Sequence, residues 1–173
     1  CGHQKIVESL LKKGIADEVW YVPCHTHPFG KSMTELRHRL AMLQNIQRHS
    51  TALCKEEIFR KGKSYTIDTL QCLSQKHPNH LFSWLIGSDQ LADIHRWKDI
   101  GKILQQWKIF TYPRQGYALT KKKKELILLI EFPEITISST DIRQRCAEGK
   151  SIATLVDPRI ARYIKYHDLY TMP

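Results

Sequence analysis

The sequence predicts an α/β protein in which one parallel sheet carries helices on both faces. Segments with helical apolar spacing alternate with short strands rich in β-branched and aromatic residues. The strand at residues 81–86 is apolar on nearly every residue, which is typical of a parallel strand covered on both sides. Alternating elements of this length favour right-handed crossovers within one domain spanning residues 1–173.

Apolar spacing places the elements of the first half. Residues 4–13 form a helix that stops at Gly14, and residues 18–22 suit a buried strand. A second helix carries apolar residues from Leu36 to Ile46, with Thr34 as its N-cap. We expect a third helix to begin near residues 64–66.

The second half continues the alternation. Residues 81–86 and 107–112 are predicted strands, and residues 113–116 form a turn. A strand at residues 135–137 leads into a helix N-terminus. Asp157 is the N-cap of the final helix, with Pro158 in its first turn.

Composition limits the classes of function. The longest apolar run, residues 126–130, is far shorter than the roughly 20 residues that span a bilayer, so we expect no membrane protein. The formal net charge of +10 favours an anionic partner: a nucleotide, a nucleic acid or an acidic surface. Five cysteines include no C-x-x-C pair, which indicates a reduced, cytoplasmic chain.

The expected ligand site lies at the carboxyl ends of the strands, as in other open α/β sheets. Gly87 and Asp89 follow a predicted strand there, and Asp89 could hold a ribose hydroxyl or cap the next helix. In the loop after residue 22, Lys31 is a candidate cation. Its neighbours Cys24, His25 and His27 could instead suggest a metal, although they lack a second ligand pair at zinc-like spacing.

The segment after residue 137 combines hydroxyl groups with an arginine at a helix start, where a cation opposes the macrodipole. A phosphate could accept from the free N–H groups and the hydroxyls, while Arg143 supplies a bidentate fork. The alternative is a simple cap, with Arg143 solvated or paired to Asp141. The hydroxyl residues are Ser138, Ser139 and Thr140.

Other candidates are a histidine and two aromatic residues. His3 could donate to a phosphate, and Gly2 beside it would allow close approach to the backbone. Tyr65 and Trp97 stand in polar stretches and could stack on a flat ring.

These residues together resemble the bacterial nicotinate mononucleotide adenylyltransferases of the nucleotidyltransferase superfamily. The matches run in family order across nearly the whole chain, at residues 2–3, 19–23, 62–70, 85–89, 97, 114–117 and 137–143. The resemblance implies a Rossmann-like fold of the nucleotidyltransferase type. It also implies transfer of an adenylyl group from ATP to nicotinate mononucleotide with Mg²⁺, and no specific nucleic-acid partner.

The resemblance further implies residue roles. His3, Arg143 and Lys31 would hold ATP phosphates, and Tyr65, Thr66 and Trp97 would form the nicotinate pocket. The remaining nucleotide-side candidates are Gly2, Gly87, Asp89, Arg114, Ser138, Ser139 and Thr140. No protein metal ligand is assigned.

The sequence departs from the family pattern in two places. Cys1, Gly2 and His3 match the last three positions of the superfamily motif H-x-G-H, so we expect about 15 to 20 residues upstream that supply a strand, a phosphate loop and the first histidine. The loop at residues 23–31 also differs from the Pro-Pro-His-Lys-like segment common in the family.

Alternatives remain open at this point. Nicotinamide mononucleotide or phosphopantetheine could be the acceptor, although the Gly-x-Ser-Tyr-Thr motif with Trp97 argues against the latter. A basic RNA-binding module using residues 121–124 is the alternative from another class, although an exposed lysine loop explains that run more simply. The oligomeric state is open, with a homo-oligomer among the alternatives.

Overall fold

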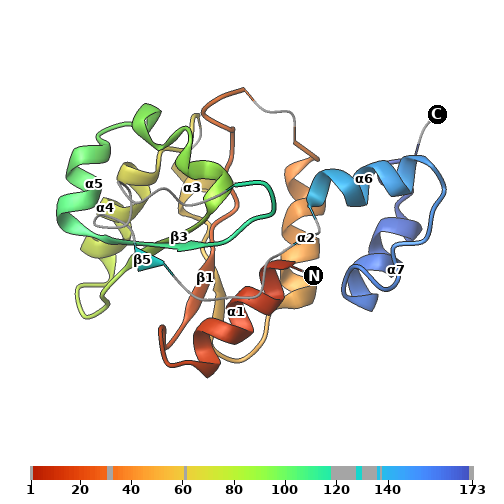
Figure 1. The fold of residues 1–173 in the computed structure, drawn as a ribbon, viewed down its shortest axis with the longest axis horizontal. Coiled ribbons are helices and arrows are strands. Elements are labelled where there is room, and N and C mark those ends of the chain that lie inside the picture. The colour runs from red at the N-terminus through yellow and green to blue at the C-terminus, as the bar shows by residue number, and fades with distance from the viewer. Residues whose placement is uncertain are drawn as a thin grey trace. The chain divides into compact units, whose positions relative to one another are not determined.

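The computed structural model describes residues 2–30, 33–60, 62–117, 128–129, 136 and 138–171. Helices alternate with parallel strands, as the sequence predicts (Figure 1). The chain divides into two compact units. The first comprises residues 1–23, 33–55 and 136–173, and the second comprises residues 24–32 and 56–135. Within the described ranges, no helix has the length and apolar character that a membrane span requires.

The first unit contains a pair of short parallel strands, with Trp20 opposite Ala52. Helix α1 buries Ile6, Val7 and Leu10 on one face, which confirms the predicted amphipathic helix. The elements of this unit are α1 (Gly2–Lys12), β1 (Val19–Tyr21), α2 (Leu36–Ile46), β2 (Thr51–Leu53), α6 (Ser139–Ala147) and α7 (Pro158–Tyr166).

The helix starts of the first unit test the predicted caps. Asp157 caps α7 by accepting from the backbone N–H of Arg159, as predicted. The prediction of Thr34 as the cap of α2 is wrong, because Glu35 occupies that position without a side-chain capping bond. Thr34 Oγ1 instead donates to Tyr170 Oη at 2.9 Å, a contact between residues too distant in sequence to be read from the local pattern.

The second unit contains a three-stranded parallel sheet in the order β3-β4-β5. The described strands therefore form two sheets rather than the single sheet predicted, since no strand within these ranges pairs both with the two-stranded sheet and with the three-stranded sheet. The elements are α3 (Glu56–Arg60), α4 (Thr66–Lys76), β3 (Ser83–Gly87), η1 (Ser88–Leu91), η2 (Ile94–Arg96), α5 (Ile100–Gln106), β4 (Lys108–Tyr112) and β5 (Leu128–Leu129). The lysine run at residues 121–124 and most of the predicted strand at residues 135–137 lie outside the described residues.

One apolar cluster holds the second unit together. Ile86 on β3 and Ile109 on β4 lie on the same face of the sheet, because Trp84 stands opposite Ile109 and alternate strand residues share a face. Helices α4 and α5 contribute Ile67 and Ile103 to this cluster, each almost completely buried. These helices therefore cover one face of the three-stranded sheet (Figure 1).

Two buried threonines of this unit should respond oppositely to removal of the hydroxyl. Thr69 Oγ1 accepts from Arg60 Nη2 at 2.6 Å and donates to Glu57 Oε1 at 2.8 Å. Thr111 Oγ1 is equally buried but has no hydrogen-bond partner among the described residues. Thr69→Val should lower the free energy of unfolding by about 1–3 kcal/mol, because Glu57 and Arg60 lose a buried partner.

Thr111→Val should leave the free energy of unfolding unchanged or raise it, because the valine removes a hydroxyl that gains nothing from burial. Urea unfolding of both variants beside the parent protein measures the difference. Equal destabilisation by the two substitutions would contradict this account of the core.

Candidate active site

The first part of the candidate site forms where β3 and β4 leave the sheet. The parallel register places Gly87 opposite Tyr112, so the segments after both strands begin at the same edge. The backbone N–H of Arg114 donates to Ser88 Oγ at 2.8 Å. Arg114 Nε lies 3.8 Å from Asp89 Oδ1. The structure thus brings Arg114 to Gly87 and Asp89, which lie on an earlier segment of the sequence.

A glycine is needed at position 87 because there is no room for a side chain, not because of the backbone conformation. Its φ of −80° and ψ of 155° suit any residue. A Cβ at this position would press against Asp89 Oδ1 and lie 2.9 Å from Arg114 Cγ. The missing side chain therefore allows the carboxylate and the guanidinium to approach the end of β3.

The surroundings of Tyr112 at this edge shift the pKa of its hydroxyl group. Burial is the main cause that raises the pKa of Tyr112 above its usual value, while the charge and hydrogen bond of Arg114 oppose the shift. Tyr112 is therefore a neutral hydroxyl at neutral pH. Arg114 and Asp89 are both partly exposed, with 22% and 35% of their side chains accessible. A guanidinium in this position can form paired hydrogen bonds with an incoming phosphate.

A second part of the site in the same unit carries aromatic side chains. Tyr65 is the N-cap of α4 and Thr66 is its first residue. Trp97 follows η2 directly, and its backbone N–H donates to the carbonyl of Ile94 at 3.1 Å. Tyr65 and Trp97 are both half-buried and pack against the cluster that contains Ile67 and Ile94. Two of the residues predicted to bind the nicotinate ring, Tyr65 and Trp97, therefore pack on one apolar cluster.

Contacts near these aromatic residues include some that sequence reasoning missed. The loop after β1 lies along the segment before α4, because the N–H of His25 donates to Ser64 Oγ and the N–H of Ser64 donates to the carbonyl of Thr26. Arg96 Cζ lies 4.5 Å from the ring centroid of Phe29 in that loop. The sequence feature that could have indicated these contacts is the pair of basic residues, Arg96 and Lys98, on either side of Trp97.

The histidines of this loop make contacts within it. His27 Nδ1 accepts from the N–H of Phe29 at 3.2 Å, and a ring nitrogen of His25 lies 3.0 Å from Thr26 Oγ1. Across the described ranges, no group of three or more potential metal ligands gathers around Cys24, His25 and His27 or elsewhere. Lys31 lies outside the described residues.

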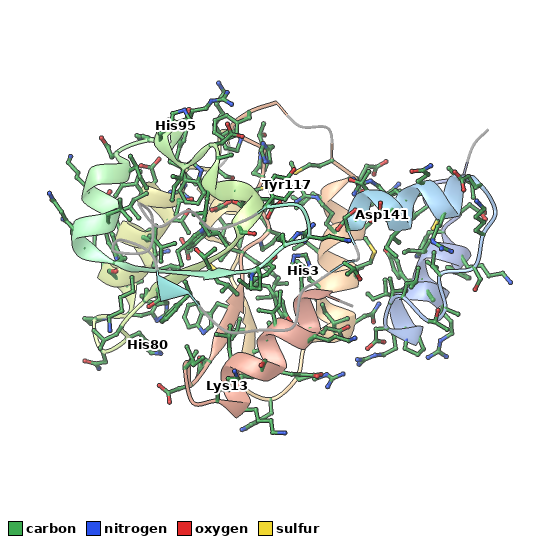
Figure 2. The ribbon with its side chains drawn as sticks, viewed as in Figure 1. His3, Lys13, His80, His95, Tyr117 and Asp141 are labelled. Atoms are coloured by element: carbon green, nitrogen blue, oxygen red, sulfur yellow. The ribbon has the colours of Figure 1, made fainter. Side chains whose placement is uncertain are left out.

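In the first unit, the start of α6 distinguishes between the two interpretations of its hydroxyl-rich segment. Asp141 Oδ2 accepts from both the N–H and the Oγ of Ser138, and Ser138 Oγ accepts in turn from the N–H of Asp141. Asp141 therefore completes the N-terminal cap of α6, and Figure 2 labels it at the start of that helix. Arg143 Nη2 donates to Thr140 Oγ1 at 3.2 Å, and among the described residues it forms no ion pair. The start of α6 therefore matches the simple cap of the alternative interpretation, except that Arg143 contacts Thr140 rather than Asp141.

The remaining candidates lie at or near helix starts. Gly2 and His3 begin α1, and His3 is exposed (Figure 2). The next residue, Gln4, donates through Nε2 to Asp157 Oδ2 at 3.2 Å, which ties this turn to the cap of α7. Ser139 and Thr140 are exposed in the first turn of α6.

Comparison with known proteins defines the class. The cytidylyltransferase-like family matches residues 1–145. The fold resembles solved structures of a nicotinic acid mononucleotide adenylyltransferase from Plasmodium falciparum, with TM-scores of 0.81 and 0.79. Both are 22% identical and cover 97% of this chain and 89% of theirs. The fold and the family match together define a nucleotidyltransferase.

Closer sequence relatives specify the family. A probable nicotinate-nucleotide adenylyltransferase of Halalkalibacterium halodurans is 35% identical over 98% of this chain and 84% of its own length. A protein of the same description from Flavobacterium johnsoniae is 33% identical over 98% of this chain and 91% of its own. This chain belongs to the nicotinate-nucleotide adenylyltransferase family.

The space at Gly87 yields a stability prediction with a control on a nearby helix. Gly87→Ala should lower the free energy of unfolding by about 1–3 kcal/mol, because the new Cβ must displace Asp89 and Arg114. Gly101 lies in α5 with open space around it, so Gly101→Ala should raise that free energy by about 0.4–1 kcal/mol. Chemical unfolding of both variants gives the comparison. A Gly87→Ala protein as stable as the parent would show that the approach of Asp89 and Arg114 is looser than described.

Proposed function

We propose that this chain transfers the adenylyl group of ATP to nicotinate mononucleotide, with release of pyrophosphate and formation of nicotinate adenine dinucleotide, a step of NAD biosynthesis. The observation that carries the proposal is 35% identity, over 98% of the chain, to a probable nicotinate-nucleotide adenylyltransferase. The net charge of +10 suits two anionic substrates. We place the enzyme in the cytoplasm, with no specific nucleic-acid partner, and leave a homo-oligomer open.

The reaction requires positioning and charge neutralisation rather than a protein nucleophile. A phosphate oxygen of the mononucleotide attacks the α-phosphorus of ATP in line, and the bond to the departing pyrophosphate breaks. Groups that hold both substrates in line and stabilise the developing charge can therefore account for catalysis.

We assign the ATP phosphates to one histidine, one arginine and one lysine of the chain. His3, Arg143 and Lys31 would contact phosphate oxygens, and Gly2 would admit them close to the backbone. The hydroxyls of Ser138, Ser139 and Thr140 would assist. The cap formed by Ser138 and Asp141 supports this assignment, because it leaves Arg143 without a carboxylate partner among the described residues.

We assign Gly87, Asp89 and Arg114 to the nucleotide side as well. Mg²⁺ usually binds through one or two carboxylates together with substrate phosphates, and the partly exposed Asp89 fits that pattern as a single protein ligand. When bound, Mg²⁺ would neutralise phosphate charge. Arg114, held beside Asp89, would orient the same nucleotide through its guanidinium.

We assign the nicotinate ring to Tyr65, Thr66 and Trp97. Trp97 is half-buried against the core, so one part of the indole is fixed while another part remains accessible. An aromatic surface fixed in this way can stack on a pyridine ring at little entropic cost.

Pyrophosphate release from ATP tests the function directly. We expect release that depends on nicotinate mononucleotide, with a lower kcat/KM for nicotinamide mononucleotide. Identification of the dinucleotide product by mass spectrometry completes the assay. Release that requires phosphopantetheine, or ATP-independent binding of RNA that weakens with salt, would contradict the proposal.

Arg143→Ala should impair catalysis far more than folding. Loss of a charge-assisted phosphate contact should remove about 1.5–3 kcal/mol of transition-state stabilisation, or roughly a ten- to hundredfold loss of kcat/KM for ATP. Arg145→Ala is the matched control, because Arg145 is an exposed arginine of the same helix. Unchanged kinetics in Arg143→Ala would remove this residue from the phosphate site.

Trp97→Ala should raise KM for the mononucleotide with little effect on KM for ATP. Aromatic stacking contributes about 0.5–1.5 kcal/mol beyond the burial of area, so the increase should be about two- to tenfold. Trp97→Phe should restore part of the affinity because it keeps an aromatic face. A lowered melting temperature with normal kinetics would show that Trp97 serves only the core.

A further inference from the structure

A single lysine connects the segment that carries Trp97 to the helix start that carries Tyr65. Lys98 directly follows Trp97, and its Nζ lies 2.9 Å and 3.2 Å from the two carboxylate oxygens of Asp68 in the first turn of α4. The same Nζ lies 5.1 Å from the ring centroid of Tyr65, the N-cap of that helix. The ammonium group therefore joins the segment of Trp97 to the turn that carries Tyr65 and Thr66.

Backbone hydrogen bonds and apolar packing also hold the segment of Trp97: its N–H donates to the carbonyl of Ile94, and its carbonyl accepts from the N–H of Ile100. The segment follows the three-residue η2 and precedes Asp99, which adopts a positive φ of 53° before α5 begins. On the preceding side, Arg96 donates to Asp93 at 3.1 Å and lies over the ring of Phe29. Trp97 thus stands between two tethered cations, of which Lys98 is the one tied to α4.

The ion pair has properties that suit positioning more than stability. The side chains of Lys98 and Asp68 are 46% and 30% exposed, and pairs in such surroundings contribute little to the free energy of folding. The hydrogen bond to Asp68 is the main cause that raises the pKa of Lys98 above its usual value, so the lysine is cationic throughout the neutral range. The pair is therefore intact under the conditions in which the enzyme would be assayed.

We propose that Lys98 and Asp68 form a clamp that fixes Trp97 relative to Tyr65 and Thr66 and so sets the affinity for the pyridine mononucleotide. This inference rests on the proposed function, because it concerns the ring-binding side of that site. Both residues are positioning residues that act through Trp97 and Tyr65. Stacking depends on the offset and tilt of the indole relative to the pyridine ring, so a small displacement of Trp97 or Tyr65 lowers the affinity for the mononucleotide.

The rival explanation is that Lys98 attracts the anionic substrate directly. The two explanations differ in what happens when Asp68 is neutralised. If the pair is a clamp, Asp68→Asn removes it and weakens mononucleotide binding. If Lys98 acts as a free charge, Asp68→Asn releases that charge and strengthens binding of the anionic mononucleotide.

The experiment measures KM for nicotinate mononucleotide and for ATP in Lys98→Met, Asp68→Asn and the double variant. We expect each single substitution to raise KM for the mononucleotide about two- to fivefold, the range of an exposed ion pair. The double variant should have a KM for the mononucleotide no higher than that of either single variant, because the two substitutions remove the same interaction. KM for ATP and kcat at saturation should stay at the parent values, and Lys98→Arg should restore most of the affinity.

Lys76→Met is the matched control. Lys76 also belongs to α4 and pairs with Glu56 at 2.8 Å, but it lies at the other end of the helix. We expect this variant to keep the parent KM for both substrates. The control therefore separates loss of a surface ion pair in general from loss of the clamp.

Specific outcomes would overturn the proposal. A lower KM in Asp68→Asn, an unchanged KM in Lys98→Met, or additive effects in the double variant would each exclude a clamp. Turnover of the parent protein in the same assay reports separately on the proposed function. An inactive parent would overturn both proposals, whereas an active parent with an unaffected Lys98→Met variant would overturn the clamp alone.

Discussion

The parallel pairing of β3 with β4 is the interaction on which the candidate site of the second unit depends. Its register places Gly87 opposite Tyr112, so that both strands end at one edge. The hydrogen bond from the N–H of Arg114 to Ser88 Oγ then fixes the two departing segments together. Asp89 and Arg114 can occupy this edge only because residue 87 has no side chain. The register of the two strands and the missing Cβ of Gly87 thus determine the positions of the charged groups of Asp89 and Arg114.

The ring-binding residues depend on the same sheet through its apolar face. Ile86 and Ile109 pack against Ile67 of α4 and Ile94 of η2, and Tyr65 and Trp97 are attached to that cluster. Packing of this kind supports one side of each aromatic residue, and the Lys98–Asp68 ion pair joins the two segments that carry them. The second unit therefore combines a polar edge for a nucleotide with an apolar support for a flat ring, both built on two paired strands.

Much of this could be predicted from the sequence because the signals were local and strong. The apolar run before Gly87 identified β3, and Asp157 with Pro158 identified the start of α7. The three-residue β2 and the five-residue α3 were missed, since elements this short carry almost no periodicity. The N-cap of α2 was predicted incorrectly because Thr34 bonds to Tyr170 across the unit. The contacts of Phe29 with Arg96 and of Lys98 with Tyr65 likewise depend on tertiary packing.

A crystal structure with bound nicotinate adenine dinucleotide would test the central claim most directly. The account predicts that the pyridine ring stacks on Trp97 and lies over the turn formed by Tyr65 and Thr66. A ring bound elsewhere, with Trp97 covered by protein side chains alone, would contradict it.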